Sequence, residues 1–147
     1  MESISSQQAS AVWQRVRGES APGQRLELRV LELKVLENLG AYNSCLAALP
    51  GGPRRCLATL AEDTRREAAI LRGLQRLSDQ QTAPAKTLAA QRGCPSELLT
   101  GCYHRTCRLL TEYTARTVEP GLGCVFQQLS QMAQAHCGQI AQILGSL

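Results

Sequence analysis

Apolar residues recur every three or four positions along the chain, which is the spacing of helices that bury one face. The clearest stretch is Leu26 to Leu49, where the predicted inward stripe is Leu28, Leu31, Val35, Leu39, Tyr42, Leu46 and Leu49. Pro50-Gly51-Gly52-Pro53 ends this helix, because proline and glycine continue a helix poorly. A second stretch, from about Arg54 to Leu77, follows at once. The short turn predicts that the two helices are antiparallel neighbours.

The second stripe carries polar residues at inward positions. It reads Leu57, Leu60, Thr64, Glu67, Leu71 and Leu74. Ser78 to Pro95 follows with little periodicity and is rich in Gln, Ala, Pro and Gly. A connection of this length predicts a crossover between two helix pairs.

A second helix pair is predicted downstream. Its first helix begins near Ser96, with a capping residue and an early glutamate, and runs to Val118. Its stripe is Leu99, Cys102 or Tyr103, Thr106, Leu109 or Leu110, and Tyr113. Glu119-Pro120-Gly121 is the second turn, and the last helix runs to Leu144 with the stripe Leu122, Phe126, Leu129, Ala133, His136, Ile140 and Ile143. The fold class is therefore all-α, an antiparallel four-helix bundle with one long crossover.

The domain organisation is simple. Residues 1–25 are predicted to be an N-terminal arm with a short helix over Gln7 to Arg17, anchored by Trp13, and residues 26–147 to be the single bundle domain. Leu and Ala supply most of the 44% hydrophobic content and aromatic residues only 3%, which favours helices over strands.

Charge and cysteine content narrow the function classes. The net charge is +4, but basic and acidic residues alternate, so nucleic acid and membrane surfaces are not expected partners. No apolar stretch approaches the ~20 residues of a membrane span, and no leader pattern opens the sequence, so a cytoplasmic protein is expected. The seven cysteines are an odd number without a Cys-x-x-Cys, which favours reduced thiols.

The two helix pairs form an internal repeat. Tyr42 matches Tyr113 and Leu60 matches Leu129, with a two-residue difference in the turn. The chain resembles the ferritin-like superfamily, above all its rubrerythrin-type members. The resemblance lies in this repeat, in the one-crossover topology and in segments such as His136-Cys137-Gly138-Gln139-Ile140. That resemblance implies a bundle in which each pair supplies an inward Glu from its first helix and a Glu-x-x-His from its second, and together they hold a di-iron or di-manganese centre.

Most ligands that the resemblance implies are missing. The six positions fall on Val35, Thr64, Glu67, Thr106, Ala133 and His136, and only His136 keeps the expected residue type. Glu37 cannot substitute, because it is rotated about 200° from Val35 on the helix and should face solvent. Two metal ions are not expected to bind, since such a site needs about four carboxylates and two histidines. Glu67 and His136 occupy matching places in the two halves and are instead expected to pair in the interior.

The sequence is compatible with two functions. The first is a non-catalytic bundle without a cofactor, which serves as a scaffold or interaction module. The alternative is a metal-binding protein or oxidoreductase with iron or manganese at a rearranged site of Glu32, Glu67 and His136, with Cys107 or Cys137 as further ligands. Cys137 is a poor co-ligand, because its side chain points about 100° away from that of His136. A homodimer through the Leu26, Leu33 and Leu36 side of the first helix is a third expectation.

Overall fold

The computed structural model describes residues 21–78 and 91–147, with side chains from Leu28 onward. These residues form four helices and no strand: α2 (Ala21–Ala48), α3 (Gly51–Leu77), α4 (Pro95–Ala115) and α5 (Gly123–Gly145). The predicted all-α class and its four helices are confirmed. The N-terminal helix over Gln7 to Arg17 and its anchor Trp13 lie outside the described residues, as does the side chain of Leu26.

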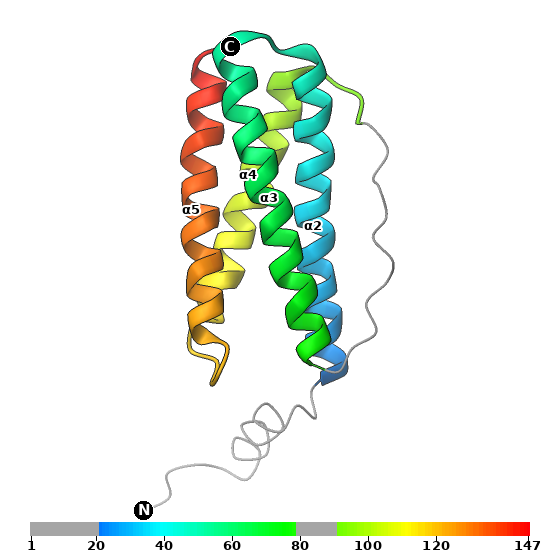
Figure 1. Cartoon of the computed structure of the whole chain (residues 1–147), viewed down its shortest axis with the longest axis vertical. Helices are drawn as coiled ribbons and strands as arrows, with labels where there is room; N and C mark the ends of the chain where they lie inside the picture. The colour runs from blue at the N-terminus through cyan, green and yellow to red at the C-terminus, as the bar shows by residue number, and fades with distance from the viewer. Residues whose placement is uncertain (1–20, 79–90) are drawn as a thin grey trace, which may run out of the picture.

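The helices pack side by side as two hairpins (Figure 1). α2 packs on α3 and α4 packs on α5, while α2 also contacts α4 and α3 contacts α5. α3 and α4 run in the same direction, so α3 ends at the opposite end of the molecule from the start of α4 (Figure 1). The segment between Ser78 and Pro95 therefore joins opposite ends, as expected of a crossover.

The first turn is shorter than the sequence predicts. α2 ends at Ala48 and α3 already begins at Gly51, three residues before the predicted start at Arg54. Gly51 has a φ of +69°, a conformation that favours glycine at this turn. Pro53 is accommodated inside the helix because it lies in the first turn, where backbone N–H groups have no intrahelical partner.

α4 ends at Ala115, three residues before the predicted end at Val118. The Thr117 hydroxyl donates a 2.8 Å hydrogen bond to the carbonyl of Thr114, so a local turn replaces the next helical turn. The chain then comes back on itself so tightly that a Cβ atom on Gly123 would lie 2.3 Å from the carbonyl oxygen of Thr117. Only glycine fits at the start of α5.

The core is divided into two hydrophobic clusters. The first contains Leu28, Leu31, Val35, Ala68, Leu71, Leu74, Leu109, Tyr113, Phe126, Leu129 and Ala133. The second contains Ala41, Tyr42, Cys45, Leu57, Leu60, Ala61, Leu99, Cys102, Ile140 and Ile143. Each helix contributes to both clusters, so each passes through the boundary between them.

The predicted stripes identify most of this core. All six positions of the α3 stripe are buried, including Thr64 and Glu67, and so is every α5 position after Leu122. On α2, Glu37 is exposed as predicted. Leu36, on the side of α2 expected to form a homodimer, is half-buried and packs against the first cluster. Among the described residues, no helix is long and apolar enough to cross a membrane.

Candidate functional site

A layer of buried polar side chains separates the two hydrophobic clusters. All four helices contribute to it, through Asn38, Thr64, Glu67, Thr106 and His136. Within each helix these residues fall between a member of the first cluster and a member of the second. The layer therefore crosses the bundle near the middle of every helix. Buried polar groups are costly unless they are paired, so a layer of them in the core is the candidate functional site.

His136 lies between two carboxylates of α3. Its Nε2 atom is 2.6 Å from Oδ2 of Asp63, and its Nδ1 atom is 3.6 Å from Oε1 of Glu67. Asp63 and Glu67 are four residues apart on one helix, so both side chains reach the same face. His136 and Glu67 are each only 2% exposed, while the Asp63 side chain is 32% exposed at the rim. The expected proximity of Glu67 and His136 is confirmed.

The second carboxylate oxygen of Glu67 also accepts a hydrogen bond. The Tyr113 hydroxyl donates a 2.7 Å hydrogen bond to Oε2 of Glu67. Burial, and then the charge of Glu67, raise the pKa of Tyr113 well above its usual range, so the hydroxyl keeps its proton. The matching residue Tyr42 is buried as well, and its pKa is raised mainly by burial, with further contributions from Cys102 and Glu67 and an opposing hydrogen bond to Thr106.

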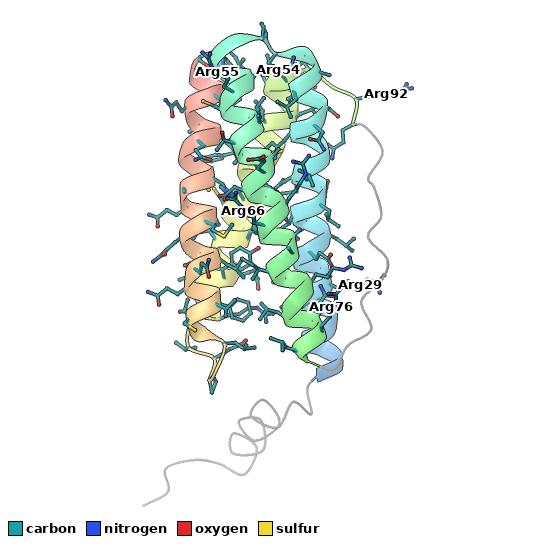
Figure 2. The ribbon with its side chains drawn as sticks, viewed as in Figure 1. Arg29, Arg54, Arg55, Arg66, Arg76 and Arg92 are labelled. Atoms are coloured by element: carbon teal, nitrogen blue, oxygen red, sulfur yellow. The ribbon has the colours of Figure 1, made fainter. Side chains whose placement is uncertain are left out.

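The imidazole of His136 is stabilised as a cation. Burial lowers its pKa, but the neighbouring carboxylates of Glu67 and Asp63 outweigh burial and raise the pKa above its ordinary value. Arg66 contributes a second positive charge through a 3.3 Å ion pair with Asp63. Asp63 therefore contacts basic groups on two sides, His136 in the interior and Arg66 at the surface. Arg66 reaches it from the outer face of α3 at mid-height (Figure 2).

A second set of polar contacts joins α2 to α4 in the same layer. Asn38 donates from Nδ2 to the Thr106 hydroxyl at 3.3 Å and accepts at Oδ1 from Nε of Arg105 at 2.7 Å. Arg105 also forms a 3.2 Å ion pair with Glu37 at the surface. Asn38 is 3% exposed, and the sequence pattern did not identify it as an interior residue. Asn38 follows the inward-facing Val35 by three residues, so this spacing could have predicted that Asn38 is buried.

Glu32 belongs to a separate contact between α2 and α3. Its Oε1 atom accepts a 2.8 Å hydrogen bond from Gln75, and its Oε2 atom lies 3.3 Å from Nη1 of Arg72. Glu32 is buried, as its predicted inward position requires. Both carboxylate oxygens of Glu32 are directed to α3 partners, whereas Glu67 contacts His136 and Tyr113, and His136 also contacts Asp63. The structure thus brings together two of the three candidate ligands and gives the third a different role.

The side chains present do not fit a metal centre. The two nitrogens of His136 already face different carboxylates, Nε2 that of Asp63 and Nδ1 that of Glu67, so neither nitrogen points to a position that a metal ion could share with other ligands. In residues 21–78 and 91–147, no group of three or more His, Cys, Asp or Glu side chains is placed to hold a metal ion. Val35 and Ala133, at two expected ligand positions, have only apolar side chains and are fully buried.

Asp63 is the member of the cluster that sequence reasoning missed. It is half-exposed, so it lies outside the apolar stripe from which interior residues were predicted. The spacing could have predicted its place in the cluster, because Asp63 precedes Glu67 by four residues and must share its side of α3. The crossing of α3 and α5, which brings His136 within reach of both, depends on tertiary packing.

Six arginines mark different places on the outer surface. The labelled arginines lie at both ends and at the middle of the bundle, on several elements (Figure 2). Apolar exposure occurs on α2, where Val30 is 46% and Leu33 is 49% exposed, one helical turn apart. No family model, curated protein or solved structure matches the chain.

Proposed function

We propose that the chain is a metal-free relative of the ferritin-like bundles that acts as a non-catalytic scaffold or interaction module. The observation that carries this proposal is the Tyr113–Glu67–His136–Asp63 cluster in the middle of the bundle. It occupies the level where ligands are expected from the resemblance, but its charges are neutralised within the protein. A polar layer of this kind stabilises a defined alignment of four helices without binding a cofactor.

The positions of the replaced ligands support the proposal. Val35, Thr64, Thr106 and Ala133 are all buried, so glutamates there would have lain inside the bundle. The threonine hydroxyls instead donate to carbonyls of their own helices, Thr64 to Leu60 and Thr106 to Cys102, each at 2.7 Å. These bonds satisfy each hydroxyl proton locally. These two threonines therefore need no metal ion to satisfy their hydroxyl groups.

The alternative metal-dependent function would need a different arrangement. Glu32 would have to leave Gln75 and Arg72, and His136 would have to turn from Asp63. Each step breaks buried polar contacts, at a cost of about 1 to 3 kcal/mol per contact. We therefore favour the metal-free function.

Metal content tests the proposal directly. Protein purified without chelators is analysed for iron, manganese and zinc, and its melting temperature is then measured with each ion added. We expect well below one ion per chain and no metal-dependent stabilisation. A Cys107→Ser, Cys137→Ser variant is the control for zinc held by thiols. About two ions per chain, or one ion that is lost in His136→Leu, would show that the bundle is a metalloprotein.

The proposed interaction surface is the exposed side of α2. Val30 and Leu33 are one turn apart there, and we propose that a second copy of the chain covers them. Light scattering should show a dimer that Val30→Glu with Leu33→Glu converts to a monomer. Val118→Glu, at an exposed apolar residue in the second turn, is the matched control and should leave the mass unchanged. A monomeric native protein would rule out this contact.

A further inference from the structure

Two cysteines face each other across the second helix hairpin. The Sγ atoms of Cys107 on α4 and Cys137 on α5 are 3.7 Å apart, and both residues are half-buried. All seven cysteines lie in the described ranges and are free thiols. Among them, Cys107 and Cys137 are the pair whose sulfur atoms are in contact within those ranges.

The positions suit a covalent bond between the helices. A disulfide needs sulfurs about 2.05 Å apart, so these atoms must approach by roughly 1.7 Å. Rotation about the Cα–Cβ bonds moves each sulfur, and the helix backbones already lie in extensive contact. In the repeat register, the matching residues of the first hairpin are Leu36 and Ala68, both of which pack in the first cluster. The pair thus occupies a helix-packing position where the first hairpin carries apolar side chains.

We infer that Cys107 and Cys137 form a reversible thiol–disulfide site whose oxidant is a small disulfide of the glutathione type. One thiolate attacks the small disulfide, forms a mixed disulfide and releases one small thiol. The second cysteine then attacks the protein sulfur of the mixed disulfide and displaces the second small thiol. Both protein thiol protons pass to the two released thiols. The protein loses two electrons, and the small disulfide gains them.

The cross-link acts on the centre of the bundle. Cys137 directly follows His136, and Cys107 directly follows Thr106, so the disulfide fixes α4 to α5 at the level of the polar layer. In the reduced protein, noncovalent packing alone holds this level together. This site goes beyond the proposed scaffold function and stands whether or not the bundle binds metal.

Peptide mapping of the folded protein tests the site. Native chain is incubated with oxidised glutathione, quenched with acid, alkylated and digested with trypsin. Residues 117–147 contain no Lys or Arg, so Cys124 and Cys137 fall in one peptide, and the experiment uses the Cys124→Ser variant to remove this ambiguity. We expect Thr106–Arg108 linked to that peptide, with two hydrogens fewer than the separate peptides. Dithiothreitol should remove the link.

Two variants and one competing outcome complete the test. In the Cys124→Ser background, Cys107→Ser and Cys137→Ser should each abolish the linked peptide, while circular dichroism shows the same helix content. The inference is overturned if both thiols remain free for alkylation after native oxidation. It is also overturned if glutathione stays attached to either cysteine without a link between them.

Discussion

The Nε2 atom of His136 lies 2.6 Å from Oδ2 of Asp63, closer than any distance between His136 and Glu67 in the same cluster. The short contact is that of a charge-assisted hydrogen bond, and it ties the interior of α5 to the rim of α3. Because the Asp63 side chain is partly exposed, one end of the buried cluster reaches solvent. A substitution at the partly exposed Asp63 can therefore be used to test the charge of the buried His136.

The Glu67–His136 pair should show strong coupling in a double-mutant cycle. His136→Leu leaves the Glu67 carboxylate buried with only the Tyr113 hydroxyl, and should lower the free energy of unfolding by about 3 to 5 kcal/mol. Glu67→Met leaves His136 paired with Asp63 and should cost about 1 to 3 kcal/mol. The double variant should recover most of the summed loss, because it removes both desolvated groups.

Urea unfolding of the four proteins measures this cycle. Tyr113→Phe in the double variant is the matched control, since it removes the hydroxyl that the loss of Glu67 leaves without its acceptor. We expect it to raise the stability of the double variant further. Losses that simply add would show that Glu67 and His136 do not act as a pair.

Helix periodicity explains why this cluster could be predicted only in part. Glu67 and His136 follow the inward stripes of their own helices, and the repeat matches them, so their proximity was predictable. Asp63 and Asn38 lie at the edges of those stripes, where small rotations of a helix decide burial. The Cys107–Cys137 contact depends on the axial offset between α4 and α5, which the tight turn at Gly123 sets.

The charge of His136 should make stability depend on pH. Its folded-state pKa is raised by Glu67 and Asp63 despite burial, so the stabilisation is complete below the unfolded pKa of about 6.5. It is lost as pH rises from there through the folded-state pKa. The free energy of unfolding should therefore fall over this range above pH 6.5. Asp63→Asn should lower the pKa of His136 and reduce that fall.

Proton NMR of the imidazole ring measures this pKa directly. The chain has two histidines, so His104→Gln leaves a single set of ring signals for the titration. Arg66→Gln is a useful second variant, because it removes the exposed cation beside Asp63 without touching His136. A titration of His136 below its ordinary value in the native protein would contradict the cationic state.

Oxidation of Cys107 and Cys137 should stabilise the fold. The disulfide would close a loop of about 30 residues, for which the chain-entropy relation gives about 3 to 4 kcal/mol. Urea midpoints of the oxidised and reduced Cys124→Ser protein compare the two states, with Cys107→Ser as the protein that oxidation should leave unchanged. An oxidised form no more stable than the reduced one would mean that the link strains the α4–α5 hairpin.

Placing the ligands that the resemblance implies at the six positions should convert the bundle into a metal protein. All six expected positions face the interior, so the change needs side chains and no new backbone. The variant keeps His136 and carries Val35→Glu, Thr64→Glu, Glu67→His, Thr106→Glu and Ala133→Glu. With four carboxylates and two histidines, it should bind about two iron or manganese ions per chain. Elemental analysis after metal loading and gel filtration gives the stoichiometry.

The rebuilt variant is expected to need metal in order to fold, because four carboxylates would otherwise be buried together. Circular dichroism should show helix content that rises when iron or manganese is added and falls with a chelator. The matched control adds His136→Leu to the same variant, which removes one ligand and should weaken binding and metal-dependent folding together. If the rebuilt protein folds fully without metal and binds none, the six positions do not converge on one centre. The resemblance to ferritin-like bundles would then be limited to helix order, and the Glu67–His136 pair would be an ordinary core ion pair.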